Sequence, residues 1–259
     1  MIFVAVLFLR EASEALSLGD LMSRRVFAQR AVPDGYLQYY AFVESLPSRY
    51  EVALVPVKKD LFESLPKNAR IVELGPGPGT NFNWIRRSQP KSYVAVEKNP
   101  YYDFWKGDLK QKKDIFGTEN VQLIRSLSDL PTDSADVLIA TLVLCSIDDL
   151  ASTLKDIHRV LEPTTGQYFF LEHVKAHDGA YANGQKFIAP LQRAFADGCD
   201  PTKDTENTIR DAGFQIDKLQ RLTLSNAFFP LSPVIAGVAS QNNKKKKIPL
   251  DNNKTPSPI

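Results

Sequence analysis

The sequence predicts an α/β fold: a doubly wound, mostly parallel sheet of seven strands. Three observations lead to this prediction. Apolar runs of strand length alternate with amphipathic segments of helix length, one run leads into a glycine-rich loop, and the 259 residues, 43% of them hydrophobic, suffice for one sizeable core. Parallel strands joined by helices require right-handed crossovers. We therefore expect one α/β domain over 48–240, an N-terminal helical extension over 1–47 and a C-terminal tail over 241–259.

Each expected strand is rich in β-branched or aromatic residues and is bounded by turn residues. The run 135–140 is apolar almost throughout, which is typical of a strand buried on both faces. The strands are expected at 70–74, 92–97, 121–124, 135–140, 167–171, 214–223 and 233–239. Helices are expected in pieces over 11–65, the last of them 48–65, and then at 80–88, 99–113, 149–161, 184–196 and 202–212.

The loop after the first strand is the most informative segment of the chain. It reads Gly-Pro-Gly-Pro-Gly-Thr-Asn from Gly75 to Asn81. Gly75, Gly77 and Gly79 remove every Cβ where a ligand must approach the backbone. Thr80 and Asn81 are expected to cap the following helix, whose unpaired N–H groups attract the negative or polar end of a ligand.

Two acidic residues accompany this loop. Glu73 lies directly before it, and Glu97 ends the second strand about twenty residues further on, where a nucleotide-binding βαβ unit places a carboxylate for ribose hydroxyls. The dinucleotide fingerprint G-x-G-x-x-G does not fit, because Thr80 stands where its third glycine belongs. This disfavours a nicotinamide-dependent oxidoreductase, which stays a rival interpretation together with a tight turn that binds nothing.

The pattern E-x-G-x-G-x-G, from Glu73 to Gly79, resembles the S-adenosylmethionine loop of class I methyltransferases. The resemblance implies S-adenosylmethionine as the cofactor. It also implies that Glu73 helps to hold the methionyl amine and that Glu97 binds the ribose hydroxyls. The three glycines, Thr80 and Asn81 are expected to contact the cofactor as well, and Thr141, after the fourth strand, is expected to face its methionyl portion.

Three further motifs occur in the order that one family has. T-L-V-L-C-S follows the fourth strand at 141–146, F-F-L-E-H-V stands at 169–174, and D-G-C-D-P-T at 197–202. Together they resemble the animal thiol S-methyltransferases (the methyltransferase-like seven family) and their plant relatives, over roughly residues 50–240. The resemblance implies a last strand that inserts antiparallel, and methyl transfer to a small-molecule acceptor, with an alkyl thiol favoured.

The chain departs from that family at several positions. Pro76 and Pro78 stand between the glycines of the loop, where proline stiffens a turn without needing its N–H. The family's G-E-x motif after the third strand, which flanks the adenine, is replaced by residues 125–129. Ser128 or Asp129 is the expected partner of the adenine amine in its place.

His173, at the end of the fifth strand, is the candidate catalytic residue. It could accept the acceptor's proton or orient the acceptor, or it could be a histidine bonded to a neighbouring loop. A thiol needs little help because a few per cent of it is ionised at neutral pH, whereas an oxygen acceptor needs a base. Transfer to oxygen, nitrogen or carbon of a small or lipophilic molecule therefore stays an alternative. Asp197 and Asp200 either form the mouth of the acceptor pocket or cap the helix near Thr202.

Cysteine content and charge restrict the remaining possibilities. Cys145 and Cys199 are the only cysteines and form no C-x-x-C pair, so we expect no disulfide scaffold, no zinc or other metal site, and two thiols that pack as small apolar groups. The net charge is only +2, and the lysine run Lys244–Lys247 supplies it, so no broad basic face is left for nucleic acid. The tail around this run lacks apolar periodicity and is expected to be disordered.

The first nine residues, Met1–Leu9, are strongly apolar but too short to span a bilayer, which takes about twenty residues. They could form a shallow membrane anchor or a packed strand. We expect a cytoplasmic protein that contacts a membrane or lipid surface through this segment; the family resemblance implies the endoplasmic reticulum or a lipid droplet. A non-catalytic lipid-surface protein is the alternative from outside the enzymes.

Overall fold

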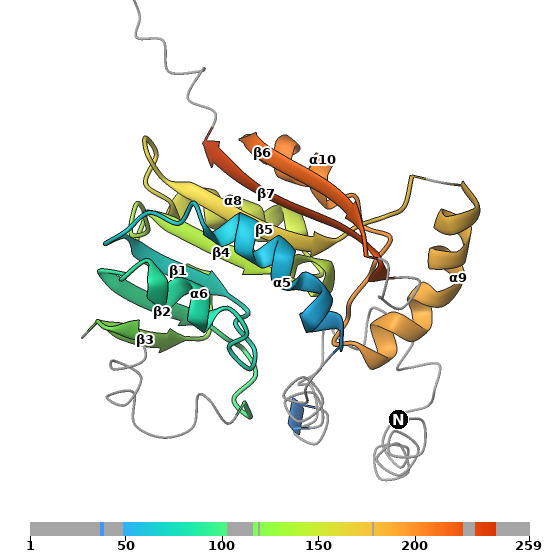
Figure 1. Ribbon diagram of the computed structural model, residues 1–259, viewed down its shortest axis with the longest axis horizontal. Helices are drawn as coiled ribbons and strands as arrows, with labels where there is room; N and C mark the ends of the chain where they lie inside the picture. The colour runs from blue at the N-terminus through green and yellow to red at the C-terminus, as the bar shows by residue number, and fades with distance from the viewer. Residues whose placement is uncertain are drawn as a thin grey trace, which may run out of the picture.

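The computed structural model describes residues 37–38, 49–102, 116–118, 120–177, 179–224 and 231–241. A twisted seven-stranded sheet forms the centre of this part of the chain. Helices α5 and α6 lie in front of the sheet and α8 and α10 behind it, and α9 lies beyond the end at which β5 finishes (Figure 1). The described elements therefore form the three layers of a doubly wound α/β fold.

The sheet has the order β3-β2-β1-β4-β5-β7-β6. The first five strands run parallel, and β7 runs antiparallel to both β5 and β6. The strands are β1 (Arg70–Leu74), β2 (Ser92–Val96), β3 (Val121–Ile124), β4 (Val137–Thr141), β5 (Gln167–His173), β6 (Phe214–Thr223) and β7 (Pro233–Gln241). The predicted mostly parallel, seven-stranded sheet with an antiparallel last strand is confirmed.

The observed bounds of the helices differ more from the predicted bounds than those of the strands do. They are α5 (Arg49–Phe62), α6 (Phe82–Arg87), α8 (Leu150–Val160), α9 (Gly179–Phe195) and α10 (Thr205–Asp211), with short 3-10 turns η2 (Leu127–Asp129) and η3 (Leu144–Ser146). Helix α9 begins five residues before the predicted 184–196. Helix α10 begins at Thr205 because the Asp204 side chain, and not one near Thr202, accepts a bond from the backbone N–H of Asn207.

Several predictions fall on residues outside this description. They concern the apolar segment Met1–Leu9, most of the extension over 1–47, the lysine-rich tail after Gln241 and most of the helix expected over 99–113, of which only the turn at 99–102 is described. Within the described ranges, no helix combines the length and the apolar character needed to cross a bilayer.

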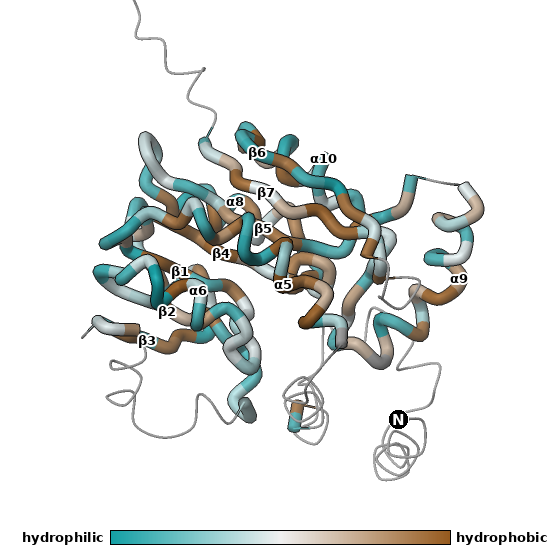
Figure 2. Tube along the Cα trace, viewed as in Figure 1, coloured by the Kyte–Doolittle hydropathy of each residue, from teal (hydrophilic) through white to brown (hydrophobic). Residues whose placement is uncertain are grey.

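Side chains alternate along β1, and this explains why helices cover both faces of the sheet. Ile71 packs with residues of α5 and α6, whereas Val72 and Leu74 pack with α8 and α10 on the other face. The neighbouring strands β4 and β5 are buried along almost their whole length. Figure 2 shows these central strands in brown, with hydrophilic residues on the outer sides of the helices. Burying each large apolar side chain contributes about 1.5–3 kcal/mol, so these strands hold the two cores together.

A charged contact joins the starts of β1 and β4. The Arg70 guanidinium donates to both carboxylate oxygens of Asp136, with Nη2 2.6 Å from Oδ1 and Nε 3.2 Å from Oδ2. The backbone N–H of Arg70 donates to the same carboxylate at 2.8 Å. The Arg70 contacts hold the pKa of Asp136 below its ordinary value. The pair is partly exposed, so its stabilisation is modest.

We expect Asp136→Asn to lower the free energy of unfolding by about 1–2 kcal/mol at neutral pH. Because the folded pKa of Asp136 is depressed, its stabilisation is complete above the unfolded pKa of about 4 and is lost as pH falls through the folded pKa. Urea unfolding of wild type and variant at neutral pH, and at the lowest pH at which both fold, measures this difference. Asp133→Asn is the control, since Arg70 contacts only the backbone carbonyl of Asp133. If the difference in unfolding free energy between wild type and Asp136→Asn were as large in acid as at neutral pH, the ionised Asp136 carboxylate would not be its source.

Candidate active site

The glycine loop lies at the carboxyl end of β1, where ligands of doubly wound sheets bind. Gly75, Gly77 and Gly79 have φ angles of +60°, +52° and +88°, a backbone region that favours glycine. Space is limiting as well. A Cβ on Gly75 would lie 2.5 Å from Cγ2 of Val143, and one on Gly79 would overlap the ring of Phe82. Two of the glycines, Gly75 and Gly79, are therefore required by both conformation and packing.

Glu97 directly follows β2, and its carboxylate holds the glycine loop. Oε2 accepts the N–H of Gly77 at 3.0 Å, and Oε1 accepts the N–H of Asn99 at 2.8 Å. Burial raises the pKa of Glu97, and these two bonds oppose the rise. Each carboxylate oxygen has a second lone pair, so both can still accept hydroxyl groups of a ribose.

Glu73 is fully buried, and both of its carboxylate oxygens already have partners within the protein. Oε1 accepts from Nδ2 of Asn81 at 2.8 Å, and Oε2 accepts from the hydroxyl of Tyr93. Nδ2 of Asn81 also donates to Oγ1 of Thr141 at 2.7 Å. The carboxylate that the family resemblance assigns to the methionyl amine thus bonds Asn81 and Tyr93 within the protein, and it orients the Asn81 side chain.

Asn81 occupies the N-cap position of α6, but its side chain makes no capping hydrogen bond. The expectation that it caps the helix is wrong, because its amide nitrogen is used by Glu73 and Thr141. Among the described residues its Oδ1 is one of three buried side-chain oxygens that lack a hydrogen-bond partner. An unpartnered buried acceptor beside a bare loop is the feature that a ligand ammonium group would satisfy.

Lys58 is a site residue that the sequence prediction missed. It is 2% exposed, and its Nζ donates to Oγ1 of Thr80 at 2.8 Å and to Glu51 at 2.7 Å. The side chain of Thr80 therefore accepts from Lys58, on α5, and not from the start of α6. The available signal was the position of Lys58 between Leu54 and Leu61, on the apolar side of its helix.

The residues predicted near the adenine are engaged locally. Asp129 accepts the N–H of Ser126 at 3.2 Å, and the Ser126 hydroxyl accepts the N–H of Ser128 at 3.2 Å, which together form a capping box on η2. Both Ser128 and Asp129 are exposed. Arg125 donates instead to the backbone carbonyl of Glu97 at 2.8 Å, so this segment supports the end of β2.

Glu172, the acid of the E-H pair on β5, organises the segment that follows β4. Its carboxylate accepts three consecutive backbone N–H groups, those of Val143, Leu144 and Cys145, at 3.2, 3.0 and 3.3 Å. Burial raises the pKa of Glu172 to about 7, although these bonds lower it. Two of the sequence motifs, at 141–146 and 169–174, are thus parts of one structural unit.

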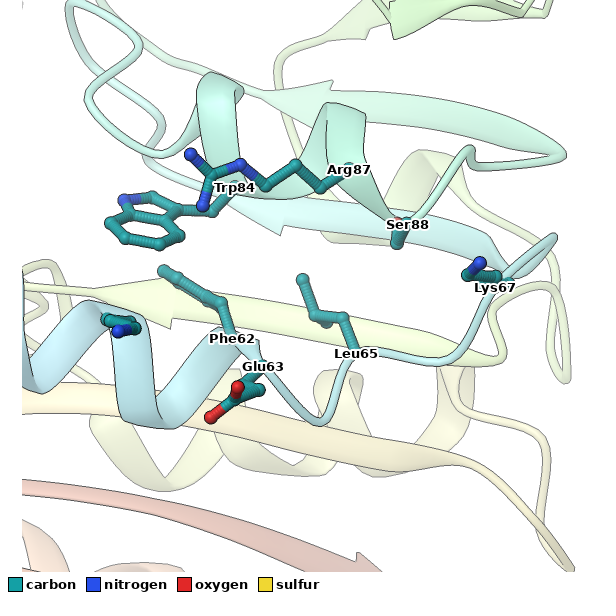
Figure 3. A pocket seen from close by; sticks show the side chains of 8 residues that line it. Phe62, Glu63, Leu65, Lys67, Trp84, Arg87 and Ser88 are labelled. Atoms are coloured by element: carbon teal, nitrogen blue, oxygen red, sulfur yellow. The ribbon is translucent and has the colours of Figure 1, made fainter.

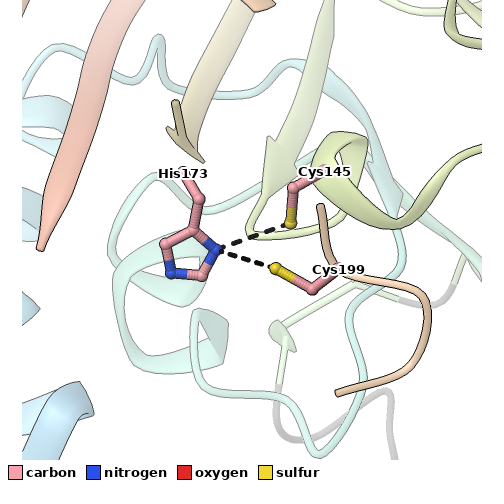
Figure 4. Close-up of side chains that lie close together, drawn as sticks. All are labelled: Cys145, His173 and Cys199. Carbon is pink, nitrogen blue, oxygen red and sulfur yellow. Dashed lines mark hydrogen bonds between the residues drawn. The ribbon is translucent and has the colours of Figure 1, made fainter. Parts of the chain in front are cut away.

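His173 lies next to this unit, with both ring nitrogens in contact with other residues. Nε2 lies 2.8 Å from the hydroxyl of Tyr50, on α5. Nδ1 faces two thiols, with Sγ of Cys145 at 3.5 Å and Sγ of Cys199 at 3.4 Å (Figure 4). All three of these residues, the histidine and the two cysteines, are buried. The prediction that the cysteines pack as plain apolar groups is wrong, because both sulfurs contact a ring nitrogen.

The D-G-C turn brings Cys199 to this position. Asp197 and Gly198 have φ angles of +46° and +75°, and the N–H of Asp200 donates to the carbonyl of Cys145 at 3.0 Å. The carboxylate of Asp200 accepts from Thr202 and from Arg193. Asp200 therefore shapes this turn, and the expectation that it caps the following helix is wrong.

A separate cavity of 280 Å³ lies between the end of α5 and α6 (Figure 3). Phe62, Leu65 and Trp84 line it, and the guanidinium of Arg87 lies 4.7 Å from the centre of the Trp84 ring. Lys67 and Ser88, which also line it, come just before β1 and β2 begin. The cavity is thus at the amino ends of the strands, away from the glycine loop.

The chain is similar to known methyltransferases in both sequence and fold. Residues 48–219 match a family model described as a methyltransferase domain. The thiol S-methyltransferase TMT1B of Rattus norvegicus is 29% identical over 192 residues, which are 70% of this chain and 77% of that protein. The human thiol S-methyltransferase TMT1A is 27% identical over 200 residues, 73% of this chain and 80% of that protein.

Among solved structures, a SAM dependent methyltransferase from Aquifex aeolicus superimposes with a TM-score of 0.52 at 14% identity, over 78% of this chain and 97% of that one. These findings agree with the loop geometry in supporting S-adenosylmethionine as the cofactor, and the predicted enzyme class is confirmed. The family model covers most of the described strands and all the motifs discussed above, so this chain belongs to the methyltransferase domain family.

Proposed function

We propose that this chain transfers the methyl group of S-adenosylmethionine to the sulfur of a small-molecule thiol. The observation that carries the proposal is the glycine loop tied to Glu97, beside the unpartnered Oδ1 of Asn81. The named activity of the relatives supports a thiol as the acceptor. Transfer to oxygen, nitrogen or carbon of a small molecule is the alternative that the experiments below separate.

The residues present fit this cofactor. The loop of Gly75, Gly77 and Gly79 at the carboxyl end of β1 has the backbone conformation of a nucleotide-binding turn, and the Glu97 carboxylate suits two ribose hydroxyls. Oδ1 of Asn81 suits the methionyl ammonium. Glu73 and Thr141 hold the Asn81 amide in place from two strands, so they act as positioning residues.

When bound, the cofactor supplies a methyl group attached to a sulfonium sulfur. The rest of the cofactor is a good leaving group because it departs as a neutral thioether. The protein's contribution is then mainly alignment of donor and acceptor, which is worth up to about 7–11 kcal/mol of the barrier. His173 lies at the end of β5, two strands from the glycine loop at the same edge of the sheet, where an acceptor would meet the methyl group. Its buried ring, fixed by Tyr50, is suited to orienting a thiol beside the two cysteines.

Contact with a membrane surface is a further part of the proposal, supported by the sequence alone. The apolar run Met1–Leu9 suits a shallow peripheral anchor on a cytoplasmic protein. Flotation of the full chain and of a variant lacking residues 1–9 with lipid vesicles tests it, and equal flotation of both would remove the segment as the anchor.

Glu97→Ala is expected to weaken binding of S-adenosylmethionine by at least about tenfold, since each hydrogen bond to a charged group contributes about 1.5–3 kcal/mol. Isothermal titration calorimetry with wild type and variant measures the change. Glu63→Ala, which removes an acid from the remote cavity, should bind as wild type does. Binding of NAD in place of S-adenosylmethionine by the wild type would refute the cofactor assignment.

Asn81→Ala should affect binding of the amino acid portion of the cofactor and not binding of its nucleoside portion. It is expected to weaken binding of S-adenosylmethionine, while binding of methylthioadenosine, which lacks the amino acid portion, changes little. Glu97→Ala should weaken both, because both ligands carry the ribose. Circular dichroism and thermal melting of each variant serve as folding controls. Equal losses for both ligands in Asn81→Ala would mean that Asn81 only supports the loop.

The acceptor is identified by mass spectrometry after incubation with S-adenosylmethionine and a mixed library of alkyl thiols, phenols and amines. We expect S-methyl products to dominate, because a thiol is partly ionised at neutral pH and needs no strong base. The matched control is the same library with Glu97→Ala. Exclusive methylation of phenols or amines would favour the alternative acceptor class.

A further inference from the structure

We propose that Cys145, His173 and Cys199 bind a soft divalent metal ion, with zinc expected, and leave one coordination position for the thiolate of the acceptor. The metal site stands on the geometry of these three side chains. The assignment of its fourth position rests, in addition, on the proposed thiol methyltransferase function.

Two of the three separations between the ligand atoms are those that tetrahedral coordination requires. Nδ1 of His173 lies 3.5 Å from one sulfur and 3.4 Å from the other, and all three atoms lie within 4.8 Å of one another (Figure 4). With Zn–S bonds of about 2.3 Å and a Zn–N bond of about 2.0–2.1 Å, a tetrahedral site has an S···N edge of about 3.5–3.6 Å. The observed S···N separations match those edges.

The hydrogen bonds around His173 leave Nδ1, the ring nitrogen that faces the two sulfurs, available to bind a metal ion. The carbonyl of Leu231 can only accept, so the hydroxyl of Tyr50 donates its single proton to it, at 3.1 Å. With that proton used, we assign Nε2 of His173 as the donor to the Tyr50 oxygen, at 2.8 Å. In this tautomer Nδ1 is unprotonated and faces the two sulfurs at 3.5 and 3.4 Å. A histidine that donates its second N–H to a neighbouring group is the usual arrangement of a metal ligand.

A chain of hydrogen bonds, from the thiol of one cysteine to the sulfur of the other and from there to Nδ1, is the competing arrangement, and the metal-content measurement below separates the two. Nδ1 of His173 has one lone pair in the ring plane, yet two thiols approach it at almost equal distance. Only one of them can donate a good hydrogen bond. Two thiolates and one imidazole are, by contrast, a ligand set that suits zinc. Within the described ranges, these three residues form the one group of three or more metal-binding side chains.

The ligands are held in place by the surrounding backbone. Glu172 accepts the N–H of Cys145, and the carbonyl of Cys145 accepts the N–H of Asp200. Lys203 donates to the carbonyls of Leu144 and Ile147, the residues on either side of Cys145 and Ser146. Three segments that are distant in the sequence are thereby fixed around the proposed ion, and this positioning reduces the conformational cost of binding it.

Three protein ligands with an open fourth position are typical of catalytic zinc sites. An acceptor thiol that binds there releases its proton to solvent and keeps its lone pair. A bond then forms between this sulfur and the methyl carbon, and the bond from that carbon to the cofactor's sulfonium breaks. The electron pair of the broken bond stays on the sulfur of S-adenosylhomocysteine. The neutral thioether is a weaker ligand than a thiolate and leaves the metal.

Metal content of the full-length, tag-free protein, measured by inductively coupled plasma mass spectrometry after purification with zinc, tests the site. We expect about one zinc per chain, a loss of bound zinc in Cys145→Ser and in Cys199→Ser, and wild-type content in His177→Asn, which changes an exposed histidine. Absence of zinc from wild-type protein that still binds S-adenosylmethionine in calorimetry would overturn the metal site. Zinc retained in both cysteine variants would overturn it too.

Replacement of zinc by cobalt gives a readout that does not depend on variants that might misfold. The wild type should show thiolate-to-cobalt charge-transfer absorption, and addition of an acceptor thiol should change the ligand-field bands. A cobalt spectrum that no thiol alters would overturn the acceptor assignment. If thiols alter the spectrum but no thiol is methylated, the proposed function fails while the metal site stands, so the two failures are distinguishable.

Discussion

The hydrogen bond from the N–H of Gly77 to the Glu97 carboxylate is the contact on which the arrangement of the site depends. It joins the glycine loop after β1 to the end of β2, so that two parallel strands present their ends as one surface. The loop can follow this path because Gly75, Gly77 and Gly79 adopt positive φ angles. The carboxylate that shapes the loop is also the group to which we assign the ribose hydroxyls, and this proposal links the conformation of the loop to ligand binding.

Behind this surface, hydrogen bonds between buried polar side chains of neighbouring strands fix the position of the Asn81 side chain. Glu73 on β1 and Thr141 on β4 both bond the amide nitrogen of Asn81, and this leaves the Asn81 oxygen without a partner among the described residues. Burying such groups is costly unless each is hydrogen-bonded. One unsatisfied oxygen within an otherwise satisfied network is therefore informative, and it is the acceptor to which we assign the methionyl ammonium group.

The ends of β4 and β5 form a second unit, organised by Glu172. Its three backbone N–H bonds hold the segment with Cys145 against β5, and the next residue, His173, then faces both cysteines. The Glu-His pair thus has a division of roles: the carboxylate builds the loop, and the imidazole contacts the two cysteines and Tyr50. Both units lie at the carboxyl edge of the sheet, so cofactor and acceptor can meet there.

The sheet could be predicted from the sequence because apolar runs of strand length are a local signal, and the strand positions differ from the prediction mainly at their ends. The glycine loop and Glu97 were equally recognisable, since the spacing of a βαβ unit determines both. The roles of Lys58 and Cys199 were not recognisable, and for Asn81 the sequence predicted a cofactor contact but not the bonds to Glu73 and Thr141 that orient it. Cys145 and Cys199 are separated by more than fifty residues, and no local pattern relates them. Only the packing of three chain segments around His173 brings the sulfurs together, because side-chain contacts between distant segments depend on how strands and turns are placed in space.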